Sequence, residues 1–412
     1  MAERVEIAVV GAGIVGLAVA LRLAAEGREV AVIDPVAPGS GASWGNAGTI
    51  ADYAVQPVGT PSVLRNLPSL LFDRDSPLAI RRAAILTLAP WLARFLVQSL
   101  PGPAQRNAVA LAGLLADAGP LWRAFAAAAG ALEFLRDRGC LYAFRTAEAA
   151  RAARGDLAFR RGLGVSLELL TEAEFAGLEP GYPAASGGGA FFPGAIFLTD
   201  PGQVAARVAA AANAAGVRFV CSQVLGLSRE AGGVRLTGEG LNLKAARVVI
   251  AAGAHSRPLA RMAGDRIPLD TERGYHLEFD GEEARVSRPV CPTERGFYLC
   301  PMAGRLRVAG TVELGGLAAP PSPHRLAALE RGARAIFPDL PAPSRSWMGF
   351  RPSLPDSLPV IGPSRGGPEV IHAFGHGHIG LTLAPVTAAI VADLIAGRDP
   401  GRDIAAVRPG RF

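Results

Sequence analysis

The amino-acid sequence predicts an α/β protein: a parallel sheet with crossover helices, into which an α+β domain with an antiparallel sheet is inserted. A glycine-rich turn joins a short apolar strand to a helix at residues 5–27, and a second strand–glycine–helix unit lies at 370–395. Between them, at 140–198, short strands alternate with helices without the spacing of β–α–β units. The 412 residues, 50% of them hydrophobic, suffice for two domains.

The first 34 residues contain the most informative motif. An apolar run at 5–10, typical of a buried parallel strand, leads directly into the pattern GxGxxG. The first glycine of this pattern permits a sharp turn, the second lets a pyrophosphate approach the backbone closely, and the third lets the helix pack close to the strand. The start of the helix offers unpaired N–H groups to the anion. The residues concerned are Gly11, Gly13, Gly16 and, at the helix start, Ile14 and Val15.

Asp34 ends the second strand of this unit, which runs over 29–33. An acidic side chain at this distance from the glycines accepts hydrogen bonds from ribose hydroxyls. A tight turn without a ligand is the alternative interpretation, but it does not explain why three glycines and the acid coincide. The motif therefore predicts a nucleotide site, although it does not separate FAD from NAD.

Charge and cysteine content narrow the class of protein. The formal net charge is +6 and the pI about 9.6, but the arginines are scattered, so a nucleic-acid partner is disfavoured. An anionic substrate or a membrane surface fits the charge equally well. The four cysteines form no metal-binding or CxxC spacing, and we expect reduced thiols and no metal site. No signal peptide is visible, and no uninterrupted apolar run reaches the length of a membrane span, which predicts a cytoplasmic protein.

A loop rich in glycine and small polar residues follows Asp34. Its segment 41–48 reads GASWGNAG, and the Ser43 hydroxyl and the Asn46 amide are candidate partners of phosphate or of a flavin edge. The opening fingerprint and this GxSxxNAG-like loop together resemble flavoproteins of the D-amino-acid-oxidase type, and bacterial D-amino-acid dehydrogenases most closely. The resemblance implies FAD as the cofactor, with Ser43, Asn46, Ala47 and Gly48 beside the flavin ring. The family usually has glutamate where this chain has Asp34.

The resemblance also implies a fold and a division of the chain. It is a glutathione-reductase-like, Rossmann-type FAD-binding domain with an inserted α+β substrate domain whose sheet is antiparallel. We expect the discontinuous FAD domain at 1–60, 200–264 and 346–412, and the substrate domain at 61–199 and 265–345. Two later segments would complete the FAD site. Their residues are Val224, Ala252 and Gly253 in the returning segment, and Gly380, Leu381 and Thr382 at the start of the last helix.

Arg351 is the principal substrate-binding candidate. It precedes Pro352, so it lies on a rigid extended segment, where its guanidinium group presents a fixed fork that matches a carboxylate. A surface salt bridge is the alternative, and the resemblance favours a substrate carboxylate because G-x-R-P followed by D-x-x-P-x-I-G is shared with relatives that use the arginine in this way. Further candidates for the pocket are Tyr275, His276, Tyr298, His376 and His378. Because no cysteine lies near the last glycine turn, we expect the FAD to be non-covalent.

The resemblance implies oxidative deamination of a D-amino acid. The α-hydrogen leaves as hydride to flavin N5, the imine hydrolyses to a keto acid and ammonia, and the electrons pass to a respiratory or artificial acceptor. Three alternatives stay open: a D-proline or D-hydroxyproline dehydrogenase, a glycine- or sarcosine-type oxidase, and the flavin subunit of a hetero-oligomeric electron-relay complex. The basic, apolar helix predicted at 83–100 is compatible with ordinary packing or with peripheral contact to an anionic membrane, where a quinone or another electron-transfer partner would be met.

Overall fold

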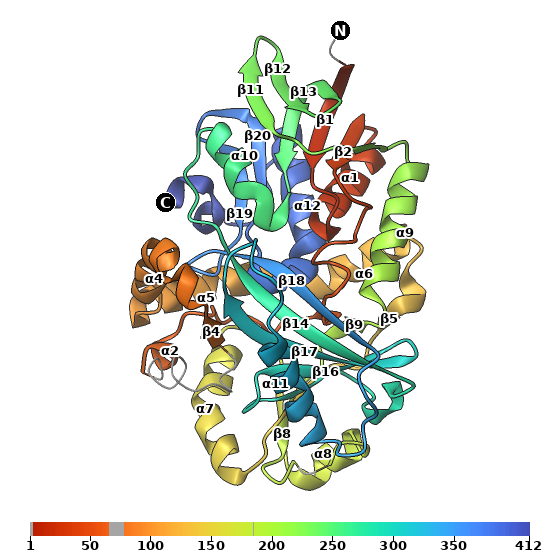
Figure 1. Cartoon of the computed structure of the whole chain (residues 1–412), viewed down its shortest axis with the longest axis vertical. Coiled ribbons are helices and arrows are strands. Elements are labelled where there is room, and N and C mark those ends of the chain that lie inside the picture. Colours follow the sequence, from red (N-terminus) through yellow and green to blue (C-terminus); the bar gives the residue numbers. More distant parts are fainter. Residues whose placement is uncertain (1–2, 66–77, 184) are drawn as a thin grey trace.

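Two large sheets, one above the other, organise the computed structural model, which describes residues 3–65, 78–183 and 185–412 (Figure 1). The first sheet contains five parallel strands in the order β10-β2-β1-β13-β20. These strands are β1 (Glu3–Val10), β2 (Val30–Asp34), β10 (Arg218–Cys221), β13 (Leu241–Ile250) and β20 (Gly367–Phe374). Three antiparallel strands extend it: β11 (Gly226–Glu230), β12 (Gly233–Gly238) and β19 (Val360–Ser364).

Strand β1 is buried on both faces, as its continuous apolar sequence predicts. Ile7 and Val9 point to the face covered by α1 (Ile14–Ala25), α9 (Pro201–Ala214) and α12 (Gly380–Ala396), whereas Ala8 and Val10 face α10 (Ser256–Met262). This arrangement confirms the predicted strand–turn–helix–strand unit at the N-terminus. Residues 241–250 form one continuous strand, β13, which leads directly to Ala252 and Gly253.

Helix α12 contains Pro385, which has no N–H group to bond the carbonyl of Leu381 one turn earlier. Trp122 of α6 (Ala118–Ala128) donates its indole N–H to that carbonyl at 2.9 Å and to the carbonyl of Thr382 at 3.1 Å. The indole is fully buried. It therefore satisfies an acceptor that would otherwise be orphaned beside the last glycine turn, and it holds the start of α12 in place.

The second sheet has the order β18-β14-β17-β16-β15-β6-β8-β7 and is mainly antiparallel. The predicted antiparallel sheet is thus present, and two of its pairings, β15 with β6 and β17 with the additional strand β4, are parallel. Its strands are β4 (Leu78–Ile80), β6 (Cys140–Ala143), β7 (Glu168–Leu170), β8 (Gly189–Phe192), β14 (Asp270–Asp280), β15 (Val290–Pro292), β16 (Phe297–Met302), β17 (Arg305–Leu314) and β18 (Arg345–Ser353). Strand β18 joins this sheet although most of it lies in the segment 346–412 assigned to the FAD domain.

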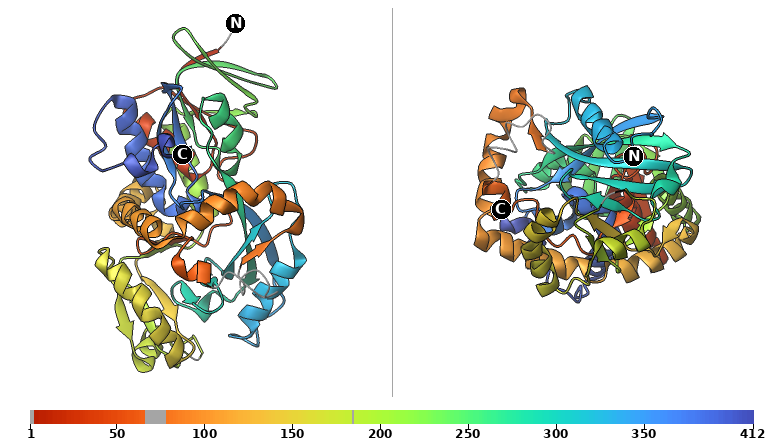
Figure 2. Two further views of the ribbon diagram at one scale, coloured as in Figure 1. Left: turned by 90° about the vertical axis from the view of Figure 1, so that its left-hand side faces the viewer. Right: turned by 90° about the horizontal axis from the view of Figure 1, so that it is seen from below.

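Helices cover the outer face of the second sheet and the side of the molecule. Helix α11 (Pro323–Arg334) packs on β14 and β17, and Figure 2 shows α4 and α5 in orange along the outside at mid-height. The other helices of the described residues are α2 (Pro61–Arg65), α4 (Ile85–Gln98), α5 (Pro101–Leu115), α7 (Ala147–Gly162) and α8 (Glu172–Leu178). A small sheet joins β3 (Thr49–Ile50), β9 (Ile196–Leu198) and β5 (Leu135–Arg136).

Two helical stretches, each interrupted by polar or charged residues, are long and apolar enough to span a membrane by length and composition alone. They are Pro101–Ala128 and Gly377–Ala396. The second has 67% of its most apolar window buried, because α12 packs against α1 in the core of the first sheet. Core helices pass the same test, so length and apolar composition are weak evidence for a membrane span here.

Candidate active site

The glycine-rich turn after β1 is packed too tightly for a side chain at Gly11 and at Gly16. Gly11 has a φ of +110°, and a Cβ there would lie 2.5 Å from the carbonyl oxygen of Ala251. A Cβ on Gly16 would lie 2.0 Å from the carbonyl oxygen of Gly11. The end of β1 therefore touches the end of β13, and this contact brings Ala252 and Gly253 next to the turn. Their contact with FAD stays a prediction.

Ser43 and Asp34 converge on the same turn from two loops. The Ser43 hydroxyl accepts a hydrogen bond from the N–H of Ile14 at 2.9 Å, so it satisfies an orphan donor at the start of α1. Asp34 accepts hydrogen bonds from the N–H groups of Ala12 at 2.7 Å and Val36 at 3.0 Å. A Cβ on Gly13 would meet only the Ser43 hydroxyl, at 3.5 Å, which leaves room for a phosphate above the turn. Val15 is half-buried on the same helix start, and Val224 is half-buried beside β10.

The loop that carries Asn46 lies between the two sheets. Asn46 accepts a hydrogen bond from the N–H of Gly48 at 2.8 Å, and Gly48 has a φ of +79°, so this turn needs glycine. Next to it, the hydroxyl of Thr382 accepts a hydrogen bond from the N–H of Ala51 at 3.0 Å. The loop residues Asn46, Ala47 and Gly48 and the helix start at Gly380, Leu381 and Thr382 thus border one region.

One face of the second sheet is turned toward this region, and we call it the inner face. Residues directly opposite one another on neighbouring strands share a face, and side chains alternate along each strand. The pairings Trp347–His276, His276–Ala309 and Ala309–Tyr298 therefore place these four residues on one face. Alternation adds Gly274 on β14 and Arg351 on β18. The inner face consists of Gly274, His276, Tyr298, Ala309, Trp347 and Arg351.

Arg351 lies flat across Gly274. A Cβ on Gly274 would be 2.3 Å from Nη2 of Arg351, so only glycine leaves room for the guanidinium group. Nη1 of Arg351 donates a hydrogen bond to the carbonyl of Thr311 at 2.9 Å. Thr311 has a φ of +60°, a conformation that β-branched residues rarely adopt, at the point where the register between β14 and β17 shifts. The bulge therefore turns a carbonyl toward Arg351 at the expense of backbone strain.

The charge of Arg351 has no anionic partner within ion-pair distance among the residues that the structure describes. Burial lowers the pKa of its guanidinium group, and only the more distant carboxylate of Glu272, opposite it on β14, counteracts this. Burial raises the pKa of Glu272, while Arg351 and Ser353 act in the other direction. A buried guanidinium group without an ion-pair partner is costly, and a bound carboxylate would remove that cost.

The two histidines of the last glycine turn have different surroundings. His376 is buried, and its Nε2 is 2.9 Å from the hydroxyl of Thr387, within α12. Burial lowers its pKa to about 3. His378 has an accessible side chain although it lies deep in the molecule; burial, then the charges of Arg351 and Arg160, lower its pKa to about 4. His378 therefore lies within electrostatic range of Arg351, whereas His376 is hydrogen-bonded to α12.

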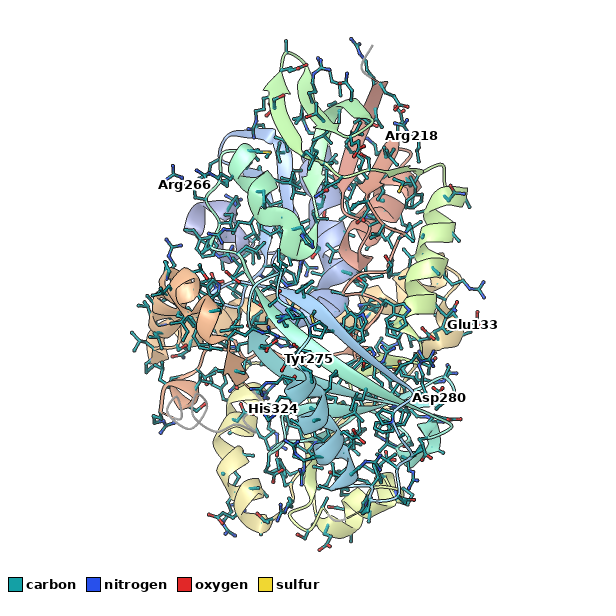
Figure 3. All side chains as sticks on the ribbon, viewed as in Figure 1. Glu133, Arg218, Arg266, Tyr275, Asp280 and His324 are labelled. Atoms are coloured by element: carbon teal, nitrogen blue, oxygen red, sulfur yellow. The ribbon has the colours of Figure 1, made fainter. Side chains whose placement is uncertain are left out.

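The two tyrosine candidates lie on opposite faces of the second sheet. Tyr298 is on the inner face, and its hydroxyl is 3.3 Å from those of Tyr53 and Tyr142. Tyr275 points the other way, toward α11 (Figure 3), where it donates a hydrogen bond to Glu313 and accepts one from the N–H of Ser322 at 3.1 Å. The expectation of a substrate-facing Tyr275 is corrected: adjacent residues on a strand face opposite sides, and Gly274 and His276 occupy the inner face.

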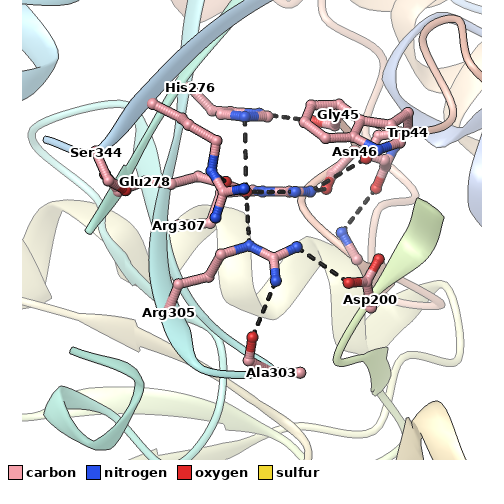
Figure 4. A network of polar contacts seen from close by, with 12 residues as sticks. Trp44, Gly45, Asn46, Asp200, His276, Glu278, Ala303, Arg305, Arg307 and Ser344 are labelled. Carbon is pink, nitrogen blue, oxygen red and sulfur yellow. Dashed lines mark hydrogen bonds and ion pairs between the residues drawn. The ribbon is translucent and has the colours of Figure 1, made fainter. Parts of the chain in front are cut away.

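A charged cluster missed by the sequence analysis fixes the loop at 44–46 to the second sheet (Figure 4). We call His276, Glu278, Arg305, Arg307 and Arg345 the Glu278 cluster. The fully buried Glu278 carboxylate is 2.6 Å from Arg307 and 2.9 Å from both Arg305 and Arg345. Burial opposes its ionisation, but the guanidinium groups of Arg307 and Arg305 prevail and lower its pKa to about 2.

The Glu278 cluster contacts the loop through backbone carbonyls. Arg307 donates to the carbonyls of Asn46 and, at 3.4 Å, Trp44, and His276 Nδ1 is 3.0 Å from the carbonyl of Gly45. The His276 ring stacks on Trp347, with centroids 5.1 Å apart, and a Cβ on Gly45 would lie 2.4 Å from the Trp347 ring. Burial and the charge of Arg307 lower the pKa of His276 to about 3, so the imidazole is neutral. The alternation of charged residues along buried strands at 272–278 and 305–307 was the signal that could have revealed this cluster.

Comparison with known proteins decides the family. Residues 6–394 match the model of the DAO family, described as FAD dependent oxidoreductase. The chain belongs to this family. It is 34% identical to a D-amino-acid oxidase of Bradyrhizobium diazoefficiens, with 100% of each chain covered, and 32% identical to D-amino acid dehydrogenase 2 of Ralstonia nicotianae, with 96% and 97% covered. Glycine oxidase from Geobacillus kaustophilus has a similar structure, with a TM-score of 0.76, 26% identity and coverage of 100% and 99%.

FAD is the cofactor of this family, and the described residues fit it. The Cβ-free turn at Gly11 and Gly13, the start of α1 and the Asp34 carboxylate match a dinucleotide diphosphate and ribose, and the loop at 43–48 with the start of α12 would border the flavin ring. The cofactor supplies a two-electron acceptor. A group of three or more His, Cys, Asp or Glu side chains suitable for a metal ion is absent from the described residues.

Replacing Glu278 by glutamine is expected to weaken FAD binding about 10- to 100-fold. The substitution leaves the buried Arg307 without its countercharge and should loosen the loop at 44–46, since breaking a buried pair costs about 3–5 kcal/mol. FAD affinity is measured by titrating the apoprotein and following flavin fluorescence. Asp280→Asn is the matched control. Asp280 lies on β14 like Glu278, but its carboxylate is exposed, and it pairs with Arg345 of β18 at 3.0 Å. An unchanged FAD affinity in Glu278→Gln would contradict the role of the cluster.

Proposed function

We propose that this protein uses FAD to oxidise D-amino acids to imines, which hydrolyse to keto acids and ammonia, and that its electrons pass to a respiratory or artificial acceptor. The observation that carries the proposal is Arg351, a half-buried residue whose guanidinium group is held by the Thr311 carbonyl over Gly274 without an ion-pair partner among the described residues. Such a fork suits the carboxylate of an amino acid. Two relatives of nearly equal length, named D-amino-acid oxidase and D-amino acid dehydrogenase, support the substrate class.

The charges around the site also favour the reactive form of the substrate. Hydride leaves an amino acid only when its amine is neutral, and positive charges nearby lower the pKa of an ammonium group. Arg351 and Arg160 supply such charges, and the neutral His378 lies close to both. The remaining contribution is positioning: Arg351 fixes the carboxylate, so that the α-carbon faces the cofactor. A strong base is not required by this scheme.

An absorption spectrum of the protein during anaerobic titration tests the proposal first. We expect a flavin spectrum that bleaches with D-amino acids and not with their L-enantiomers. The panel includes D-proline, D-hydroxyproline, glycine and sarcosine, because these are the substrates of the two alternative enzymes, a proline-type dehydrogenase and a glycine- or sarcosine-type oxidase. Glycine is tested in particular because the structure resembles that of a glycine oxidase, with a TM-score of 0.76. A flavin that no amino acid bleaches would favour the electron-relay subunit. Release of bound FAD in acid, measured in the supernatant, tests the expected non-covalent attachment.

Admitting air after the flavin has bleached separates an oxidase from a dehydrogenase. Rapid recovery of the oxidised spectrum indicates oxygen as the acceptor, and slow recovery that a quinone analogue accelerates indicates a dehydrogenase. One of the two relatives is named an oxidase and the other a dehydrogenase. We propose the dehydrogenase reaction, because the molecule has an apolar, basic surface suited to a membrane-bound acceptor.

Substitutions at Arg351 and Gly274 test how the carboxylate is held. Arg351→Met removes the fork and should raise KM for D-amino acids about 100-fold or more, as expected for losing a charge-assisted bidentate contact. Gly274→Ala should raise KM about 10-fold, because its Cβ displaces the guanidinium group while the charge remains. Steady-state kinetics and FAD affinity are measured together. Arg151→Met and Gly113→Ala, both exposed, are the controls. Similar KM values in all four variants would exclude the assigned role.

The surface of α4 and α5 supports peripheral membrane contact. Leu86 is 87% exposed, and further exposed apolar side chains lie beside it: Ile85, Leu96, Val97, Leu100 and Val109. Arg94 on α4 and Arg106 on α5 are exposed, and residues 78–116 contain no acidic residue. An apolar strip with positive charges matches an anionic lipid surface. We propose that this surface binds the cytoplasmic face of a membrane, where the protein would reduce its acceptor.

Vesicle flotation tests the membrane surface. The protein should float with vesicles that contain anionic lipid and much less with zwitterionic vesicles, and high salt should release it. Leu86→Glu should reduce flotation several-fold, since it adds a negative charge to the most exposed apolar residue of the strip. Leu132→Glu, at an apolar residue that is 52% exposed outside α4 and α5, is the matched control. Equal flotation of the two variants, or none by the wild type, would overturn this proposal.

A further inference from the structure

Three tyrosines from separate segments join their hydroxyl groups beside the inner face of the second sheet. Tyr53 follows β3, Tyr142 lies on β6 and Tyr298 on β16. The Tyr298 hydroxyl is 3.3 Å from each of the other two, and the Tyr53 hydroxyl is also 3.1 Å from Cys140 Sγ. Burial is the main cause that raises the pKa of Tyr142 to about 12 and those of Tyr53 and Tyr298 further. All three phenols therefore remain hydrogen-bond donors.

A second buried guanidinium group lies against these tyrosines. Arg160 on α7 is 8% exposed, its Cζ is 5.8 Å from the centroid of the Tyr142 ring, and its Nη1 donates to the carbonyl of Tyr53 at 2.6 Å. Its Nε bonds the carboxylate of Asp156 at 2.9 Å. Nη2 has no hydrogen bond to any residue that the structure describes. One N–H-bearing end of the group is thus available to a ligand.

This second group belongs to the same site as Arg351. Tyr298 pairs with Ala309 on β17, and Thr311, whose carbonyl holds Arg351, lies two residues further along that strand. Tyr298 and Arg351 also project from the same inner face. His378 interacts electrostatically with both Arg351 and Arg160, and such an effect falls off with distance. Both guanidinium groups are therefore within electrostatic range of this one imidazole.

This second end of the site offers N–H and O–H donors, from the Nη2 of Arg160 and from the phenol hydroxyls, beside the ion pair of Arg160 with Asp156. Guanidinium N–H groups and phenol hydroxyls match an acceptor that carries negative charge, and a carboxylate is such a group. We propose that Arg160 and the hydroxyl of Tyr298 bind the side-chain carboxylate of a dicarboxylic D-amino acid, such as D-glutamate or D-aspartate, whose α-carboxylate is held by Arg351. This inference rests on the proposed function and specifies its substrate.

Matched acid and amide substrates test the inference. D-glutamate and D-glutamine have almost the same shape, as do D-aspartate and D-asparagine, so their kcat/KM ratios report the charge alone. We expect kcat/KM for the acid to exceed that for the amide about 10-fold or more in at least one pair. A site that bonds a particular group of its substrate discriminates against an analogue without that group. Arg160→Gln should bring that ratio close to one. Arg161→Gln is the control, because the side chain of this neighbour bonds, within the described part of the chain, only the carbonyl of Leu167, at 3.0 Å.

Two further measurements keep the test independent of folding and of turnover. If Arg160→Gln does not fold, Tyr298→Phe takes its place as the test. This variant retains the aromatic ring, and it should reduce the preference for the acid several-fold. Glutarate and its monoamide carry no amine and therefore cannot be oxidised by the enzyme. Their dissociation constants are measured from the shift that each causes in the flavin spectrum. Tighter binding of glutarate, about 10-fold, supports the inference even if no amino acid reduces the flavin, an outcome that would overturn only the proposed function. Equal treatment of acids and amides in kinetics and binding would overturn the inference.

Discussion

The ion pair between Glu278 and Arg307 is the interaction on which the geometry of the site depends. It is fully buried, and it lies where the second sheet meets the loop that follows the glycine-rich turn. Through Arg307 the carboxylate fixes the carbonyls of Trp44 and Asn46, and the same loop carries Ser43 to the start of α1. Two sheets with separate hydrophobic cores are thereby held in one relative position. A purely apolar contact would bury as much surface but would not define the direction of the backbone groups.

Much of the first sheet was predictable because its constraints are local. Gly11, Gly16 and the apolar run before them fix a strand, a turn and a helix within a short stretch, and the structure shows why each glycine is needed. Arg351 could be singled out for a similar reason, because Pro352 stiffens its own segment. The alternation of charged residues along β14 and β17 indicates buried charges, but the contacts of the Glu278 cluster could not be predicted, since its members lie on three strands and contact a loop more than 200 residues away. Tyr275 was misplaced because a strand predicts two faces without saying which is inner.

The site as a whole combines groups that neither sheet could supply alone. The first sheet provides the glycine turn, Asp34 and the start of α12, all suited to a nucleotide. The inner face of the second provides Arg351 and Tyr298, which are suited to an anionic substrate. Neutral histidines lie between the two sets, since burial and neighbouring guanidinium groups lower the pKa values of His276 and His378. Positive charge is therefore concentrated on arginines, which keep it at every physiological pH.

Thr311 has a consequence for how this protein could evolve. Its left-handed backbone conformation costs about 1–3 kcal/mol, and this strain turns a carbonyl toward Arg351. A glycine there would relieve the strain and raise the stability of the fold, but it would also free the carbonyl to rotate away. Selection for heat resistance and selection for turnover therefore act in opposite directions on this one position. A lineage adapting to high temperature would have to gain its stability elsewhere in the molecule.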